Sequence, residues 1–263
     1  TLRYPVYIPF AGDTLRFTFD NYCGSEAVTV TRATVSAATS PVYEKMPLAC
    51  PCKKETICDI TFSKNESVTM EAHQTAVSDP VSFPVKKGMT LTVSLYFADF
   101  TLMQSAVLVT GPLSKGFFSL GDQTHADALP MDTTKTTNWF YFLSNIELMT
   151  AEENHTVICY GDSITAGAWP DYLTLLARQN PDNHTAFIRR ATSGSRVLRQ
   201  YECITYDSYG LKGINRFPHE IPTTGADTVI IQQGINDIIH PVGIETNPFR
   251  PVSYTHLRAH ETP

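Results

Sequence analysis

The spacing of hydrophobic residues along the chain changes near residue 150. Before that point apolar and polar residues alternate in runs such as 15–19, 28–35 and 91–97, with Asn, Gly and Pro residues between the runs. Alternation of this kind predicts half-buried β-strands, and the intervening residues are typical of the turns that join strands. No helical period of useful length occurs in this region. Residues 1–150 are therefore predicted to form a β-sandwich domain.

After residue 150 the pattern becomes one of apolar, β-branched runs with helical spacing between them. The runs are residues 156–160, 185–188 and 228–232, and each leads into a loop of small polar residues. This order predicts an α/β domain with a parallel sheet, in which all three loops lie at the carboxyl edge where ligands bind. Residues 151–250 are assigned to this domain.

The three loops carry residues suited to attack on an acyl group. Ser163, in the block Gly-Asp-Ser-Ile-Thr, would place a hydroxyl and a helical N–H at the end of the first strand. Gly194 follows the second strand and would offer a backbone N–H, and Asn236 follows the third and would offer a side-chain amide. Each of these residues alone is ordinary cap or turn chemistry. The ordered set of three predicts a nucleophile with donors for an oxyanion.

These blocks resemble those of the SGNH (GDSL-type) hydrolases, in particular a bacterial branch with an N-terminal β-domain. The resemblance implies that Ser163 is the nucleophile and that Gly194 and Asn236 complete the oxyanion hole. The second block matches only in part, because Arg189 and Ser195 stand where many members carry asparagine. The fold implied for the chain is an N-terminal β-sandwich followed by an incomplete flavodoxin-like, three-layer α/β domain.

The family takes its general base from a late D-x-x-H block, in which the histidine deprotonates the serine. Two stretches of the chain fit this spacing, residues 122–125 and 237–240. The first precedes the nucleophile and is interpreted as a polar loop. In the second, His240 follows the Asn236 loop by about one helical turn and is a candidate for lining the substrate cleft.

The last residues of the chain do not supply the missing block. Residues 252–262 match the translation of a transposon-type sequencing adaptor, so residues 251–263 are interpreted as a non-native tail and excluded from the fold. The chain is therefore expected to be C-terminally truncated, to hold only the first half of the hydrolase domain, and to be inactive without its Asp/His block.

Composition narrows the range of partners. The chain has 263 residues, of which 42% are hydrophobic, and no apolar run approaches the roughly 18 residues of a membrane-spanning helix. The formal net charge of −6 argues against nucleic acid as a partner. Cys50, Cys52 and Cys58 lie close together but lack paired C-x-x-C spacing, so no metal or cofactor is expected. Scattered cysteines favour a cytoplasmic location, although the chain begins with Thr1 and secretion stays open; the oligomeric state is not indicated.

Two functions remain open at this point. The first is a serine esterase that hydrolyses carboxylic esters through an acyl-enzyme, with a small-molecule or carbohydrate ester as substrate and acetylated carbohydrate suggested by the resemblance. The second is a non-catalytic carbohydrate-binding protein with a decayed hydrolase domain. A D-x-x-H block in the downstream sequence would favour the enzyme.

Overall fold

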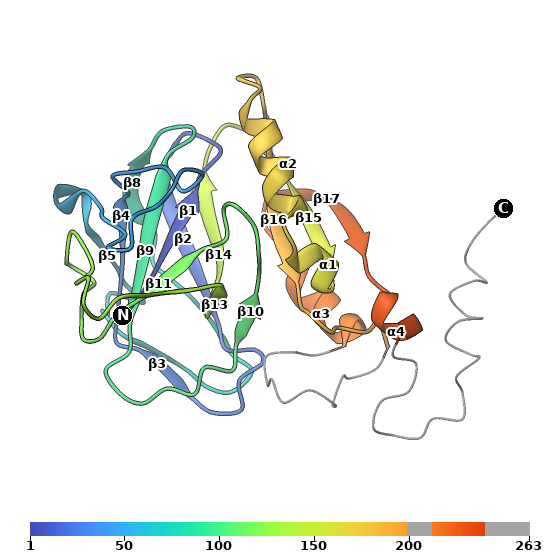
Figure 1. The fold of residues 1–263 in the computed structure, drawn as a ribbon, viewed down its shortest axis with the longest axis horizontal. Coiled ribbons are helices and arrows are strands. Elements are labelled where there is room, and N and C mark those ends of the chain that lie inside the picture. Colours follow the sequence, from blue (N-terminus) through green and yellow to red (C-terminus); the bar gives the residue numbers. More distant parts are fainter. Residues whose placement is uncertain (199–211, 240–263) are drawn as a thin grey trace.

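The computed structural model describes residues 1–198 and 212–239, and β-strands predominate in it (Figure 1). The elements of the N-terminal part, residues 1–150, are β1 (Leu2–Tyr7), β2 (Gly12–Asp20), β3 (Val28–Val30), β4 (Arg32–Ala37), the 3₁₀ helix η1 (Lys54–Thr56), β5 (Cys58–Ile60), β6 (Val68–Met70), β7 (Thr75–Val77), β8 (Val81–Val85), β9 (Thr90–Tyr96), β10 (Ala106–Leu108), β11 (Gly116–Phe118), β12 (Lys135–Thr137), β13 (Trp139–Tyr141) and β14 (Leu143–Met149).

Two antiparallel sheets contribute the main hydrophobic core. One has the order β12-β11-β1-β9-β4-β5, and in the other β2 pairs with β14, β7 and β8. Alternation along β2 buries Leu15, Phe17 and Phe19 completely, and they share one core cluster with Leu91 and Val93 of β9. Side chains that alternate along a strand reach one face of the sheet, which is why the period of two predicted these strands.

Strand β9 is covered on both faces, so its polar residues need partners inside the protein. Thr92 shares a hydrogen bond of 2.5 Å with Ser36, and the Ser94 hydroxyl accepts one of 2.9 Å from the Arg3 side chain. Arg3 is buried and also donates to the carbonyl oxygen of Cys50. The polar face of the sheet is thus hydrogen-bonded to a layer of loops rather than to water.

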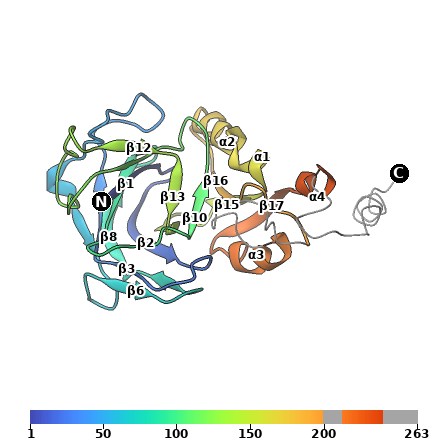
Figure 2. The same ribbon diagram turned by 60° about the horizontal axis from the view of Figure 1, so that its bottom comes forward.

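The C-terminal part, residues 151–239, contains the only parallel strands of the described chain (Figure 2). Its sheet has the order β16-β15-β17. Its elements are β15 (His155–Gly161), α1 (Ser163–Ala166), α2 (Trp169–Arg178), β16 (Thr185–Ala191), α3 (Gly213–Glu220), β17 (Ala226–Gln232) and α4 (Ile235–Ile239).

The predicted fold class, an N-terminal β-sandwich followed by an incomplete flavodoxin-like three-layer α/β domain, is wrong. The described chain is mainly antiparallel β-structure in several sheets, and parallel pairing is confined to three strands. The four helices of the described part are short: α1 has 4 residues, α4 has 5 and the longest, α2, has 10. The strand–loop–helix order did predict parallel pairing of these three strands, but it overstated the helical layers that a flavodoxin-like domain needs.

The two parts lie against each other beside β10 and β13 (Figure 2). Side chains from both parts pack together there. Val109 and Phe140 of the N-terminal part pack against Ala166 and Ala191 of the C-terminal part. The backbone N–H of Thr110 donates to the carbonyl oxygen of Ala166 at 2.9 Å. Because Ala166 ends α1, this contact places the loop after β10 next to the helix that begins with the candidate nucleophile.

Candidate active site

The structure brings the three predicted loops to one edge of the parallel sheet. Gly161, at the end of β15, is level with Ala191 of β16 and with Gln232 of β17. The loops that follow are tied together, because the N–H of Thr192 donates to the Gly161 carbonyl oxygen at 3.1 Å. The N–H of Asp162 lies 3.4 Å from the Gln232 carbonyl oxygen that accepts from it. All three strands therefore end at the same level and on the same side of the molecule.

Ser163 is the first residue of α1, and its position follows from the two residues before it. Asp162 is the N-cap, and its carboxylate accepts a hydrogen bond of 3.0 Å from the N–H of Ile164. A Cβ atom at Gly161 would lie 2.2 Å from the Gln232 carbonyl oxygen, so a residue without a side chain is needed where the strands approach. Ser163 itself is exposed, so a substrate can reach its hydroxyl.

Gly194 lies in the loop after β16, in a conformation that favours glycine. Its φ angle is +74°, in the left-handed region, and it is half-buried. The next residue, Ser195, donates its N–H to the Thr192 carbonyl oxygen at 3.2 Å, which closes a turn around Gly194. The turn places the Gly194 backbone just after the end of β16.

Asn236 lies in α4 and is buried beside the Gly194 loop. Its side-chain amide donates a hydrogen bond of 3.0 Å to the carbonyl oxygen of Ser195. A carboxamide carries two N–H groups. One of them bonds to the neighbouring loop, so the second could donate a hydrogen bond to an oxyanion. The next residue, Asp237, accepts from the N–H of Val197 at 2.9 Å and links the same two loops again.

Two buried carboxyl groups flank the site. Burial raises the pKa of Asp162, while its hydrogen bond from the Ile164 N–H lowers it in part. Burial likewise raises the pKa of Asp237, against the effect of the Val197 N–H and of the nearby Arg196 charge. Both carboxylates accept backbone N–H groups of the loops, so their role in the described structure is to shape the loops.

The described histidines bond away from Ser163. Their partners are Tyr22 for His73, Asp59 and Thr124 for His125, Glu153 and Thr185 for His155, Asn154 for His184, and Asp20 for His219. His240, the candidate for the substrate cleft, and the tail of residues 251–263 lie outside the described residues.

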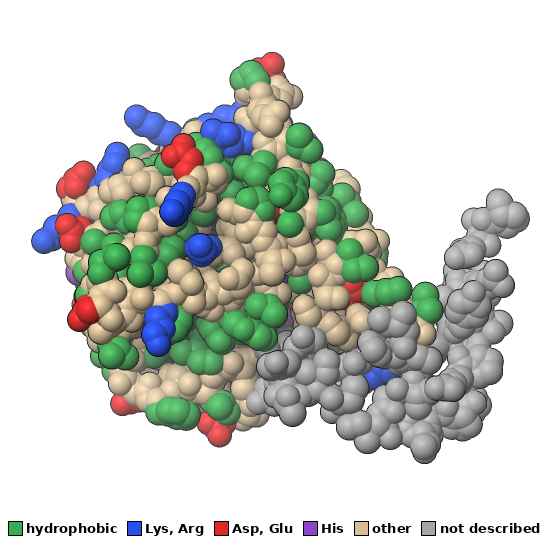
Figure 3. Space-filling view, viewed as in Figure 1, with side chains coloured by type: hydrophobic (Ala, Val, Ile, Leu, Met, Phe, Trp, Pro, Cys, Tyr) green, Lys and Arg blue, Asp and Glu red, His purple; other side chains and the backbone are tan. Residues whose placement is uncertain are grey.

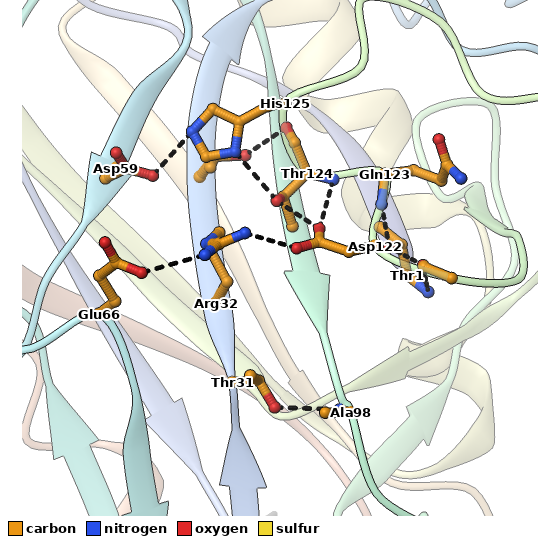
Figure 4. Close-up of polar contacts among 12 residues, drawn as sticks. Thr1, Thr31, Arg32, Asp59, Glu66, Ala98, Asp122, Gln123, Thr124 and His125 are labelled. Carbon is orange, nitrogen blue, oxygen red and sulfur yellow. Dashed lines mark hydrogen bonds and ion pairs between the residues drawn. The ribbon is translucent and has the colours of Figure 1, made fainter.

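The first D-x-x-H stretch is part of a surface network on the N-terminal part (Figure 4). Asp122 pairs with Arg32 at 2.6 Å, and His125 pairs with Asp59 at 3.0 Å. Thr124 forms hydrogen bonds to both Asp122 and His125, so residues 122–125 form a hydrogen-bonded loop of the N-terminal part. Its aspartate and histidine are joined to other elements and not to each other.

One buried residue beside the loops was missed by the sequence reasoning. Arg216 of α3 donates to the Ser195 hydroxyl at 2.9 Å and to the Gly161 carbonyl oxygen at 3.4 Å. The available signal was its spacing of four residues from Glu220, which is typical of a helical ion pair. That spacing occurs on many exposed helices, so it did not indicate a buried residue at the site.

Neither a metal site nor a membrane-spanning helix is found in residues 1–198 and 212–239. No group of three or more His, Cys, Asp or Glu side chains there is placed to hold a metal ion. The helices of this part are too short and too polar to cross a bilayer. Cys50, Cys52 and Cys58 are free thiols.

This chain has little detectable similarity to known proteins. No protein-family model and no curated protein sequence matches the chain. The chain is similar to two structures of a family two carbohydrate esterase from Clostridium thermocellum, an active-site mutant and a complex with cellohexaose. Sequence identity is 12% in both cases, with TM-scores of 0.28 and 0.29. The aligned region covers 98% of this chain but only 64% and 65% of those chains, and a likeness this low defines neither family nor function.

Proposed function

We propose that this protein is a serine esterase of the SGNH type, with Ser163 as the nucleophile. In this proposal the N–H of Ser163, the N–H of Gly194 and the side-chain amide of Asn236 form the oxyanion hole. The support is the shared placement of the three loops at one edge of the sheet, linked by the Asn236 amide on the Ser195 carbonyl oxygen at 3.0 Å. Oxyanion donors have to converge on one atom, and loops that are hydrogen-bonded to each other can hold such a geometry.

The chemistry is nucleophilic acyl transfer. The Ser163 oxygen attacks the ester carbonyl carbon, its proton passes to a general base, and the carbonyl oxygen becomes the oxyanion. Collapse of this intermediate breaks the bond to the alcohol, which leaves with a proton, and water then hydrolyses the acyl-serine. The described histidines bond elsewhere, so the proposal takes the base from outside the described residues.

The substrate class that we propose is a neutral ester, with acetylated carbohydrate as the first choice. On the face shown in Figure 3, basic side chains lie among acidic ones over the N-terminal part, and the C-terminal part is mostly hydrophobic or uncharged. A surface of this kind favours a neutral ligand over a polyanion. The resemblance of the three blocks to SGNH hydrolases supports the ester.

Selective labelling of Ser163 by a p-nitrophenyl phosphonate tests the proposal directly. The reagent phosphonylates an activated serine, and mass spectrometry of peptides measures the rate at each site. Ser163 should react at least about 100-fold faster than the exposed Ser82 of β8, because a working oxyanion hole contributes roughly that factor even where the base is weak. Ser163→Ala should remove the fast adduct, and Ser82→Ala should leave it unchanged.

The same experiment separates the two candidate functions. The absence of any described histidine next to Ser163 is the observation that favours a carbohydrate-binding protein with a decayed hydrolase domain. Equal labelling of Ser163 and Ser82, with saturable binding of a xylan or cellulose oligosaccharide, would establish the binding protein instead. Labelling of Ser163 at the expected rate would exclude it.

A further inference from the structure

A fully buried arginine lies beneath the three loops. Arg216 of α3 is 1% exposed, and its guanidinium forms two hydrogen bonds with the Glu220 carboxylate, at 2.9 and 2.7 Å. Burial alone lowers the pKa of Arg216, but the Glu220 carboxylate outweighs burial and the pKa is raised. The side chain is therefore a permanent positive charge inside the C-terminal part.

The remaining guanidinium hydrogens of Arg216 point at the parallel sheet and its loops. They donate to the Ser195 hydroxyl at 2.9 Å, and to the carbonyl oxygens of Gly161 and Arg190 at 3.4 Å each. The guanidinium also lies 5.1 Å from the centre of the Tyr160 ring, within the range of a cation–π contact. One side chain thus contacts the strand before Ser163 and the loop that contains Gly194.

Ser195 extends the same network to the third loop. Its hydroxyl accepts a second hydrogen bond of 2.9 Å from the side chain of Gln233, and its carbonyl oxygen accepts the amide of Asn236. Ser195 is 1% exposed, and its bonds with Arg216 and Asn236 are buried, where hydrogen bonds are stronger than in water. Every one of the three loops is connected to Arg216 directly or through Ser195.

A buried ion pair is a costly way to stabilise a fold. Removing two charges from water costs free energy that their attraction returns only when the geometry is good, and apolar side chains of similar volume often stabilise as well. What an arginine adds is a rigid, planar set of donors that fixes several acceptors relative to one another. At this position the fixed acceptors are those that shape the candidate oxyanion hole.

We propose that Arg216 is a positioning residue that acts through Ser195 to hold the Gly194 backbone and the Asn236 amide in register with Ser163. The purpose of that register rests on the esterase function proposed above. The set of hydrogen bonds from Arg216 to Ser195, and from Asn236 to Ser195, is called the brace. Its existence does not depend on the esterase function, and it can be measured without any substrate.

Amide hydrogen exchange of the Gly194 loop tests the brace. In Arg216→Lys the exchange of the Ser195 and Val197 amides should rise at least tenfold, because lysine cannot bond to Ser195, Gly161 and Glu220 together. Ser195→Ala, which removes only a hydroxyl, should give the same effect. The double variant should exchange no faster than Ser195→Ala alone, since both changes break one pathway.

Arg189→Lys is the matched control. The Arg189 side chain is only 11% exposed, and it pairs with Asp171 at 2.6 Å and with Ser114 at 2.8 Å rather than with the loop. Its substitution should lower the melting temperature yet leave exchange at Ser195 unchanged. If Arg216→Lys does not fold, Ser195→Ala carries the test alone.

Phosphonate labelling of Ser163 in the same variants gives the functional readout. Labelling should slow at least tenfold in Arg216→Lys and Ser195→Ala, and by less than twofold in Arg189→Lys. Unchanged exchange in folded Arg216→Lys, or faster exchange with unchanged labelling, would overturn the inference. If the original chain shows no labelling of Ser163 but the variants loosen the loop as expected, the brace stands and the esterase proposal fails.

Discussion

At the scale of single residues, the three loops of the candidate site are in direct contact with one another. Asn236 is the clearest example, because one amide nitrogen bonds the Ser195 carbonyl oxygen and can also face the position of an oxyanion. Gly161 is another, since a Cβ atom there would lie 2.3 Å from the Thr165 hydroxyl oxygen. The contacts around Gly161 leave no room for a side chain.

Substitution of Asn236 should separate the electrostatic role of its amide from its role in packing. Asn236→Ala removes a donor, and loss of one oxyanion donor slows acyl transfer by roughly 10²- to 10³-fold. Asn236→Asp keeps the shape but places a carboxylate where negative charge develops, so the rate should fall at least as far. Both rates are measured by phosphonate labelling of Ser163. Equal rates for Asn236→Asp and the original chain would mean that the amide does not face the reacting atom.

The sequence could predict which residues end the strands but not which buried side chain braces them. Ser163, Gly194 and Asn236 each follow an apolar run, and a loop at the end of a parallel strand has a defined place. Arg216 has no such marker, because its contacts with Ser195 and Gly161 join segments 21 and 55 residues apart. Long-range hydrogen bonds of this kind leave no local pattern in a sequence.

At the scale of elements, the Asp171 carboxylate joins helix α2 to β16 by an ion pair and to the N-terminal part by hydrogen bonds. Asp171, in the first turn of α2, accepts from Arg189 of β16 at 2.6 Å, from the Ser114 hydroxyl at 2.9 Å and from the Leu113 N–H at 2.8 Å. Gly111 lies against the same carboxylate, and a Cβ atom there would be 2.1 Å from it. One side chain thus joins a helix, a strand and the loop after β10.

Asp171→Ala should therefore destabilise the protein strongly. The change leaves Arg189 buried without its carboxylate, and breaking a buried pair in this way typically costs about 3–5 kcal/mol. The exposed pair between Arg16 and Glu147 provides the control, since Glu147→Gln should cost no more than about 1 kcal/mol. Unfolding in urea measures both. A loss below about 1 kcal/mol for Asp171→Ala would show that the packing of α2 does not depend on this ion pair.

The type of an element could be predicted where hydrophobic residues repeat with a regular period. The fold class could not be predicted in this way. The predicted run 15–19 lies in β2 and 91–97 largely in β9, while 28–35 is divided between β3 and β4. The flavodoxin-like expectation failed because the described chain is mainly antiparallel β-structure and its helices are short, the longest being α2 with 10 residues. Helix length depends on tertiary packing more than on local propensity, and one sequence carries that information only weakly.

At the scale of the whole molecule, the two parts are joined by polar contacts on several elements. Arg190 of β16 donates to the Ser144 carbonyl oxygen at 2.6 Å and to the Asn145 side chain at 3.2 Å. Near it, His219 of α3 pairs with Asp20 of β2 at 2.8 Å and stacks on Tyr22, with ring centres 3.7 Å apart. These contacts place partly buried charged groups of both parts at the junction.

The His219 contact makes the strength of this junction depend on pH. The hydrogen bond to Asp20 raises the pKa of His219, burial opposes it, and the charges of Glu220 and Arg190 act in opposite senses on it. A histidine whose pKa is raised by folding stabilises the folded state fully below its ordinary pKa of about 6.5, and this contribution is lost as pH rises through the folded-state value. The melting temperature of His219→Gln should thus fall furthest below that of the original chain in mildly acidic buffer.

Thermal unfolding from pH 5 to 9 measures this difference. The gap between the original chain and His219→Gln should be largest at pH 5–6 and should shrink steadily above the raised pKa, as the imidazole loses the charge that attracts Asp20. His184→Gln is the control, because His184 is exposed and its imidazole bonds to the neutral Asn154 side chain. The difference in melting temperature between this variant and the original chain should stay small at every pH. A His219→Gln gap that is constant with pH, or that grows toward pH 9, would show that stacking on Tyr22, and not the ion pair, secures the junction at this point.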